Sequence, residues 1–175
     1  MYRLSGFDAG LLSFESRLQP MNACTLVELD PSTMPGGYSF ERFRDNLSVR
    51  IKAVPELRAK LADSALNLDT PVWVEDRDFD LDRHLHVVTL SRPGDQYELS
   101  DVVGRLAAVP LDRSLPLWDM WVLQGTADDE PHQHVAVLFR VHHVLMDGVT
   151  GRDLWSRLRT TQADPPLPEP VDGIG

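Results

Sequence analysis

The stretch HVAVLFRVHHVLMDG, residues 134–148, joins an apolar run to two adjacent histidines and an Asp-Gly pair. Residues 134–141 are apolar on both faces of an extended chain, which is typical of a central strand in a covered sheet. A helix is predicted over about residues 149–159, so the histidines fall between the strand and that helix. Because active-site groups are commonly presented where strands end in turns, we expect a site at the end of this strand.

The polar residues that follow the strand have a chemical interpretation. Imidazole titrates at about pH 6.5, so His142 or His143 can accept a proton near neutral pH. Asp147 can hold the local backbone or meet a nearby arginine. Gly148 lacks a Cβ and so allows a sharp exit or the close approach of a substrate. The alternative interpretation is structural, with the two histidines as hydrogen-bonded polar groups at a strand end.

Hydrophobic periodicity and turn residues predict the elements before this strand. The expected strands cover residues 22–29, 71–74, 85–90 and 118–123, with 71–74 as an edge strand or extended segment. The expected helices cover about residues 40–54 and 96–108. A polar loop separates 118–123 from 134–141, so these two strands can form an antiparallel hairpin. The order of the elements indicates a layered α/β (α+β) fold.

Composition limits the classes of protein that this chain can represent. The 175 residues fit one domain, and 27 acidic against 17 basic side chains give a formal net charge of −10. This charge opposes nonspecific binding to nucleic acid or to anionic lipid. The single cysteine, Cys24, excludes an internal disulfide and is expected in the core. No run of about 20 apolar residues is present, so no membrane-spanning helix is predicted and the simplest location is the cytoplasm.

The C-terminal stretch differs from the rest of the chain because it is rich in proline. Proline lacks the amide donor that helices and central strands require. We therefore expect a domain at residues 1–162, followed by an extended linker at 163–175. A chain that ends in a linker is expected to be part of something longer.

The segment from His142 to Gly148 resembles the H-H-x-x-x-D-G motif of the coenzyme-A-dependent acyltransferase superfamily, which has the chloramphenicol-acetyltransferase fold. Other blocks are similar to those of the bacterial wax ester synthase/diacylglycerol acyltransferase family, and they occur in the family's order. These blocks are Leu4-Ser5 with Asp8-Ala9, Glu15 and Pro20-Met21; Pro71 to Val74 with Asp78 to Asp80 and His84; and Pro110 to Ser114 leading into Pro116-Leu117-Trp118. The resemblance extends over nearly the whole chain, to about Leu158.

The resemblance implies a fold, a reaction and a role for each motif residue. The fold would be the N-terminal half of a chloramphenicol-acetyltransferase-like protein, a mixed, largely antiparallel sheet covered by helices. His143 would be the general base and His142 a supporting residue. Asp147 would organise the site and Gly148 would form the turn. The implied reaction transfers a long-chain acyl group from acyl-CoA to diacylglycerol or to a long-chain alcohol, with acyl-CoA as substrate and no cofactor.

The resemblance also implies a substrate channel, for which Pro116, Leu117, Trp118 and Val144 are candidates. The alternative for Pro116 to Trp118 is a rigid entry into a strand, with Trp118 in the core. Two positions depart from the family pattern. Asn22 stands where the family often has histidine, and Val144 stands where it often has alanine and could narrow an acyl channel.

Three other clusters invite a metal interpretation: His84 with His86, His132 with His134, and Asp78 with Asp80 and Asp82. The histidine pairs lack a carboxylate at suitable spacing, apart from loop acids beside the second pair. The acidic run lacks the glycine and the distal glutamate of a calcium loop. We expect no metal site.

The resemblance covers only the first half of a two-half enzyme, so a C-terminal half is an expected partner and this chain alone is expected to be inactive. Peripheral association with the inner membrane or lipid droplets is a further family expectation, whereas nucleic acid is not an expected partner. Two rival functions remain open. One is a related acyltransferase or condensation-type enzyme with a non-lipid acceptor, and the other is a noncatalytic binding domain of the same fold.

Overall fold

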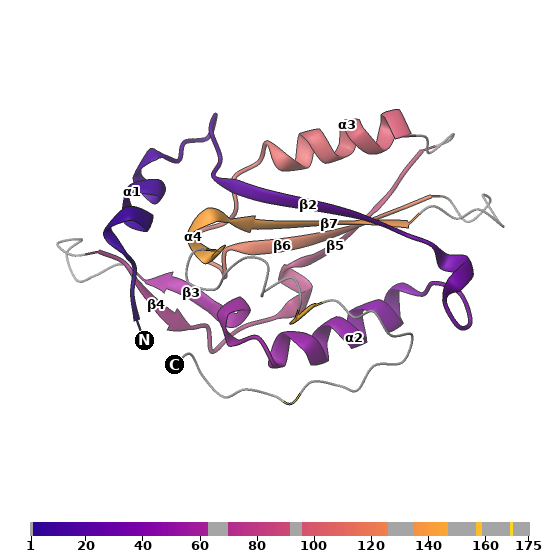
Figure 1. The fold of residues 1–175 in the computed structure, drawn as a ribbon, viewed down its shortest axis with the longest axis horizontal. Coiled ribbons are helices and arrows are strands. Elements are labelled where there is room, and N and C mark those ends of the chain that lie inside the picture. Colours follow the sequence, from indigo (N-terminus) through magenta and orange to yellow (C-terminus); the bar gives the residue numbers. More distant parts are fainter. Residues whose placement is uncertain are drawn as a thin grey trace.

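The computed structural model describes residues 2–62, 70–91, 96–125, 135–146, 157–158 and 169. Two sheets and the helices around them make up this part of the chain (Figure 1). The strands are β1 Tyr2–Arg3, β2 Asn22–Leu29, β3 Ala59–Ala62, β4 Val72–Glu75, β5 Leu85–Thr89, β6 Trp118–Gln124 and β7 Val135–His142. The α-helices are α1 Gly6–Phe14, α2 Phe40–Lys52, α3 Gln96–Ala107 and α4 His143–Met146. Short 3-10 helices lie at Pro31–Thr33, Pro55–Arg58 and Leu81–Arg83.

The main sheet is built around β7, as the apolar run predicts. Its strand order is β2-β7-β6-β5, with β7 antiparallel to both neighbours and β5 parallel to β6. Every residue of β7 is buried. The expected strands at 22–29, 85–90 and 118–123 are confirmed to within a residue at their ends, and so is the antiparallel pairing of the last with β7. The sheet is therefore mixed and largely antiparallel.

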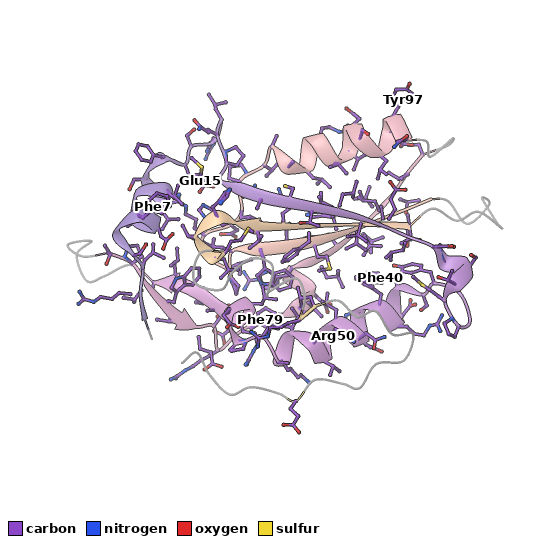
Figure 2. The ribbon with its side chains drawn as sticks, in the orientation of Figure 1. Phe7, Glu15, Phe40, Arg50, Phe79 and Tyr97 are labelled. Atoms are coloured by element: carbon purple, nitrogen blue, oxygen red, sulfur yellow. The ribbon has the colours of Figure 1, made fainter. Side chains whose placement is uncertain are left out.

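Helices cover both faces of the main sheet (Figure 1). On one face, apolar side chains of α3 pack on Leu123, Ala136 and Leu138. On the other face, Leu47 and Ile51 of α2 join the larger core, and Phe40 and Phe79 lie against it (Figure 2). Ser39 caps α2 by accepting a hydrogen bond from the Arg42 N–H. The two predicted helices are thus confirmed as the layers that bury the sheet.

A second, three-stranded sheet has the order β1-β4-β3 and was not expected. It corrects the prediction for residues 71–74, because β4 is the central strand of this sheet and not an edge strand. Proline is compatible with this place because Pro71 lies just before β4, where its carbonyl accepts the Leu4 N–H at 3.1 Å. The helix α1 was also not predicted. It is capped by the Ser5 side chain, which accepts from the Asp8 N–H.

The expectation that Cys24 lies in the core is wrong, because this residue is exposed on β2, an edge strand of the main sheet. The predicted helix at 149–159 lies outside the described residues except for Arg157 and Leu158, which are helical. The predicted linker at 163–175 also lies outside them except for Glu169. Among the described residues, no helix has both the length and the apolar character needed to cross a membrane.

Candidate active site

The two motif histidines lie at the junction of β7 and α4 and have different surroundings. His142 is the last residue of β7 and is 0% exposed, whereas His143 begins α4 and is exposed. The His142 N–H donates to the Leu117 carbonyl at 2.9 Å, and the His143 N–H donates to the Met21 carbonyl at 2.9 Å. His143 can therefore meet a substrate, while His142 is held inside the protein.

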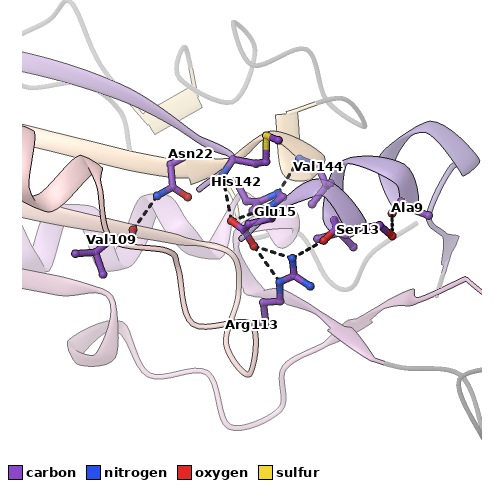
Figure 3. Close-up of polar contacts among 10 residues, drawn as sticks. Ala9, Ser13, Glu15, Asn22, Val109, Arg113, His142 and Val144 are labelled. Atoms are coloured by element: carbon purple, nitrogen blue, oxygen red, sulfur yellow. Dashed lines mark hydrogen bonds and ion pairs between the residues drawn. The ribbon is translucent and has the colours of Figure 1, made fainter. Parts of the chain in front are cut away.

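A buried carboxylate faces the His142 imidazole (Figure 3). The Glu15 side chain is only 5% exposed, and its Oε1 lies 3.4 Å from His142 Nε2. The same oxygen accepts the Met21 N–H at 3.1 Å. Arg113 donates to Glu15 Oε2 from Nε at 3.0 Å and from Nη2 at 2.7 Å, and to the Leu12 carbonyl at 2.7 Å. Glu15 thus links the half-exposed Arg113 to the buried His142.

The electrostatics of these contacts favour an ionised Glu15 and a neutral His142. Burial by itself would raise the pKa of Glu15, but the hydrogen bonds from Met21 and Arg113 hold that pKa below its ordinary value. Burial lowers the pKa of His142, and the nearby Glu15 charge only partly opposes this effect. His142 is therefore an uncharged hydrogen-bonding group at neutral pH.

Hydrogen bonding also assigns the tautomer of His142. The Val144 N–H donates to His142 Nδ1 at 3.2 Å, so Nδ1 must carry a lone pair. The proton of the neutral ring is then on Nε2, which lies 3.4 Å from Glu15 Oε1 without the direction of a hydrogen bond, so the attraction between them is electrostatic. The buried histidine is thus held by a hydrogen bond at Nδ1 and faces the Glu15 charge with Nε2.

The candidate channel residues lie in the core of the described structure. Pro116, Leu117 and Trp118 are buried, and so is Val144 at the start of α4. Trp118 donates from its indole N–H to the Leu57 carbonyl at 2.7 Å and stacks on the His84 ring at a centroid distance of 4.6 Å. These contacts fit the core interpretation of Pro116 to Trp118. Their role in a substrate channel stays a prediction.

The remaining candidates contribute less to this geometry. Asp147 and Gly148 lie outside the described residues, as do His132 and His134. Asn22, which departs from the family pattern, is the β-sheet partner of His142 and donates from Nδ2 to the Val109 carbonyl at 2.9 Å. In the part of the chain that the structure describes, no three His, Cys, Asp or Glu side chains gather to hold a metal ion.

The structure brings together residues that sequence reasoning kept apart. Glu15 and Arg113 appeared there only as members of two sequence blocks, with no role in the site. They lie 98 positions apart, so no local spacing could pair them. The available signal was that both residues lie inside blocks that resemble those of the family.

Comparison with known proteins identifies the family. The model of the wax ester synthase/diacylglycerol acyltransferase catalytic domain matches residues 4–174. Over its whole length the chain is 50% identical to a Mycobacterium tuberculosis protein that is provisionally named a diacylglycerol O-acyltransferase, and it covers 34% of that protein. Another M. tuberculosis protein with a name of the same kind is 33% identical and is covered over 39% of its length. The chain therefore spans little more than a third of these relatives.

Solved structures agree with this assignment. The wax ester synthase/diacylglycerol acyltransferase of Marinobacter aquaeolei VT8 matches all of this chain with a TM-score of 0.76 and 27% identity, over 42% of that protein. The starter condensation domain of rhizomide synthetase matches 90% of this chain with a TM-score of 0.65, over 36% of that domain's chain. Because only 19% of the aligned residues are identical, this structural match shows a shared fold alone. That fold is the chloramphenicol-acetyltransferase-like fold that the motif predicts. The chain belongs to the wax ester synthase/diacylglycerol acyltransferase family.

Proposed function

We propose that this chain is the N-terminal, motif-bearing half of an acyl-CoA-dependent O-acyltransferase. The acyl acceptor is diacylglycerol or a long-chain alcohol, so the product is a triacylglycerol or a wax ester. The observation that carries the proposal is an accessible His143 beside a buried and anchored His142, in a chain of this family. The length of the curated relatives supports a second, C-terminal half joined through residues 163–175.

The reaction needs no cofactor and no covalent acyl-enzyme. The His143 imidazole removes the proton from the acceptor hydroxyl while its oxygen attacks the thioester carbonyl of acyl-CoA. The tetrahedral intermediate collapses, the carbon–sulfur bond breaks, and the His143 imidazolium gives its proton to the CoA thiolate. The products are one ester and one free CoA. A positioned general base of this kind contributes about 10²- to 10⁴-fold to the rate.

Asp147 and Gly148 complete the proposed site as its organising carboxylate and its turn. Pro116, Leu117, Trp118 and Val144 are proposed to line the acyl channel from the side of this half. Because long-chain acceptors reside in lipid, we also propose that the enzyme works at the surface of the inner membrane or of lipid droplets. The acidic net charge gives that association no electrostatic help, so apolar contacts must supply it.

The test uses the chain extended by a C-terminal half to the length of its curated relatives, which we call the completed protein. The assay measures the release of free CoA thiol. Acceptors are diacylglycerol, a long-chain alcohol, a small alcohol and an amine. His143→Ala is expected to lower turnover by about 10²- to 10⁴-fold. His86→Ala is the matched control, because His86 lies on β5, outside the motif.

Different outcomes separate the candidate functions. Near-normal thiol release by a folded His143→Ala variant would contradict the role of His143 as the base. Turnover only with the amine or the small alcohol would identify the non-lipid acyltransferase. Acyl-CoA binding without thiol release from any acceptor would identify a noncatalytic domain.

A further inference from the structure

Glu15 makes contacts that its place at the end of a surface helix does not require. It follows α1 directly, yet its carboxylate is nearly inaccessible to solvent and contacts Met21, Arg113 and His142. An unpaired buried carboxylate is costly, and even a paired one contributes little net stability. The contacts of Glu15 are therefore better explained by a role in the geometry of the site than by stabilisation of the fold.

We propose that Glu15, paired with Arg113, is a positioning residue for His143 and acts on it along two routes. This inference rests on the proposed function, because it assigns a role in the same reaction. The first route runs through Met21, whose N–H donates to Glu15 Oε1 and whose carbonyl accepts the His143 N–H. The second runs through His142, which faces Glu15 with Nε2 and accepts the Val144 N–H with Nδ1.

The second route depends on one tautomer of His142. With the proton on Nε2, the ring presents N–H to the carboxylate and a lone pair to the Val144 amide. With the proton on Nδ1, the ring N–H would instead face the Val144 N–H, and the lone pair on Nε2 would face the Glu15 carboxylate. Both contacts are then repulsive in a buried place, where unsatisfied polar groups are expensive.

The two routes meet on either side of His143. This residue begins α4, and the first N–H groups of a helix have no acceptor within it. The His143 amide is fixed through Met21 and the next amide, that of Val144, is fixed through His142. Glu15 is therefore one group on which the placement of both amides depends.

A neutral isostere cannot replace this carboxylate. Oε2 accepts two N–H donors from Arg113, while Oε1 accepts from Met21 and faces the N–H of His142. The amide nitrogen of Glu15→Gln would oppose donors in either orientation. The ring of His142 can relieve the conflict by moving its proton to Nδ1, but it then loses the bond from Val144.

The test compares Glu15→Gln with a matched control, Glu56→Gln. Glu56 is a partly buried glutamate that pairs with Arg157 at 3.4 Å, away from the motif. The first readout is the two-bond proton–nitrogen spectrum of the chain labelled with ¹⁵N-histidine, which reports the nitrogen that holds the proton. The His142 signals are identified by their loss in His142→Asn. We expect Nε2–H in the wild type and in Glu56→Gln, and a shift toward Nδ1–H in Glu15→Gln.

The second readout is steady-state thiol release by the completed protein. Displacing a catalytic group by about 1 Å can cost about 10²-fold, so kcat is expected to fall by up to that factor in Glu15→Gln while KM for acyl-CoA stays unchanged. Arg113→Lys keeps the positive charge with fewer donors and should give an intermediate kcat with the Nε2–H tautomer retained. This variant keeps the proposal testable if Glu15→Gln does not fold.

The readouts distinguish failure of this inference from failure of the proposed function. An Nδ1–H tautomer in the wild type, or an unchanged kcat in folded Glu15→Gln, overturns the positioning role. A fall in kcat equal to that of Glu56→Gln does the same. If the wild-type completed protein transfers no acyl group, the proposed function fails, and the tautomer still decides whether Glu15 orients His142.

Discussion

Removing the carboxylate of Asp119 should destabilise the sheet that carries the motif. Asp119 on β6 faces Arg140 on β7 and accepts from Arg140 Nε at 2.8 Å and from Arg140 Nη2. The Arg140 side chain is only 3% exposed, so Asp119→Ala leaves a buried guanidinium without its counter-ion. Breaking such a pair costs about 3–5 kcal/mol.

Two contacts place the expected cost at the lower end of that range. Arg140 Nη1 also donates to the Val109 carbonyl at 2.8 Å and to the Leu106 carbonyl, near the end of α3. These charge-assisted bonds remain in the variant, so we expect a loss of about 3 kcal/mol. At about 2–4 °C per kcal/mol for a chain of this size, the melting temperature should fall by about 6–12 °C.

The assay is urea and thermal unfolding followed by circular dichroism. Asp101→Ala is the matched control, because Asp101 pairs with Arg105 at 3.1 Å on the exposed face of α3 and such pairs contribute at most about 0.5 kcal/mol. The double variant Asp119→Leu with Arg140→Met should recover most of the loss, since a buried ion pair can be replaced by apolar residues. If Asp119→Ala costs no more than Asp101→Ala, the reasoning about an uncompensated buried charge is refuted.

Two further predictions concern stability. Burial lowers the pKa values of His84 and His142, so the unfolded chain binds protons at these two histidines more readily than the folded chain does. The stability that the two neutral histidines contribute is therefore complete above about pH 6.5 and is lost as the pH falls below that value. The melting temperature should therefore drop between pH 7.5 and 5.5, with a smaller drop in His84→Gln, and a constant value would contradict this. Gly37 has a φ of +73°, so Gly37→Ala should destabilise the chain by about 1–2 kcal/mol. Gly10→Ala, inside α1 with nothing near its Cβ, should instead stabilise it by about 0.5–1 kcal/mol in the same unfolding assay, and equal effects would contradict the assignment to backbone conformation.

The parts of the fold that depend on local pattern could be predicted from the sequence. The run at 135–141 is apolar at every position but Arg140, and β7 is the central strand that this pattern indicates. The helix α2 follows from apolar side chains at intervals of three and four. Whether a strand lies at an edge depends on which strand pairs with it. Cys24 was expected in the core but lies on β2, an edge strand, and residues 71–74 were expected at an edge but lead into β4, a central strand. Both predictions failed because strand pairing is not written in the local pattern.

The site was predictable only in part for a similar reason. The position of His142 and His143 at the end of β7 follows from the motif and the apolar strand before it. The difference in their exposure does not, because it depends on residues distant in sequence, such as Glu15, which faces His142 and is held by Arg113. A carboxylate and a guanidinium that meet across 98 positions leave no periodic trace in the sequence.

The alternation of β7 explains why the Asp119–Arg140 pair and the Glu15–His142 contact lie near the motif. One face of the strand carries Val135, Val137, Phe139 and Val141, which all belong to the larger core. The other face begins with Ala136 and Leu138 under α3 and ends with Arg140 and His142.

Each of these last two residues meets a carboxylate from outside β7, Asp119 for Arg140 and Glu15 for His142. Apolar residues could replace the Asp119–Arg140 pair at equal or better stability, since buried ion pairs contribute little net free energy. What an apolar residue in place of Glu15 could not do is accept the Met21 N–H or attract the N–H of an imidazole. The polar end of this face therefore lies where β7 passes into the motif, with His142 next to His143.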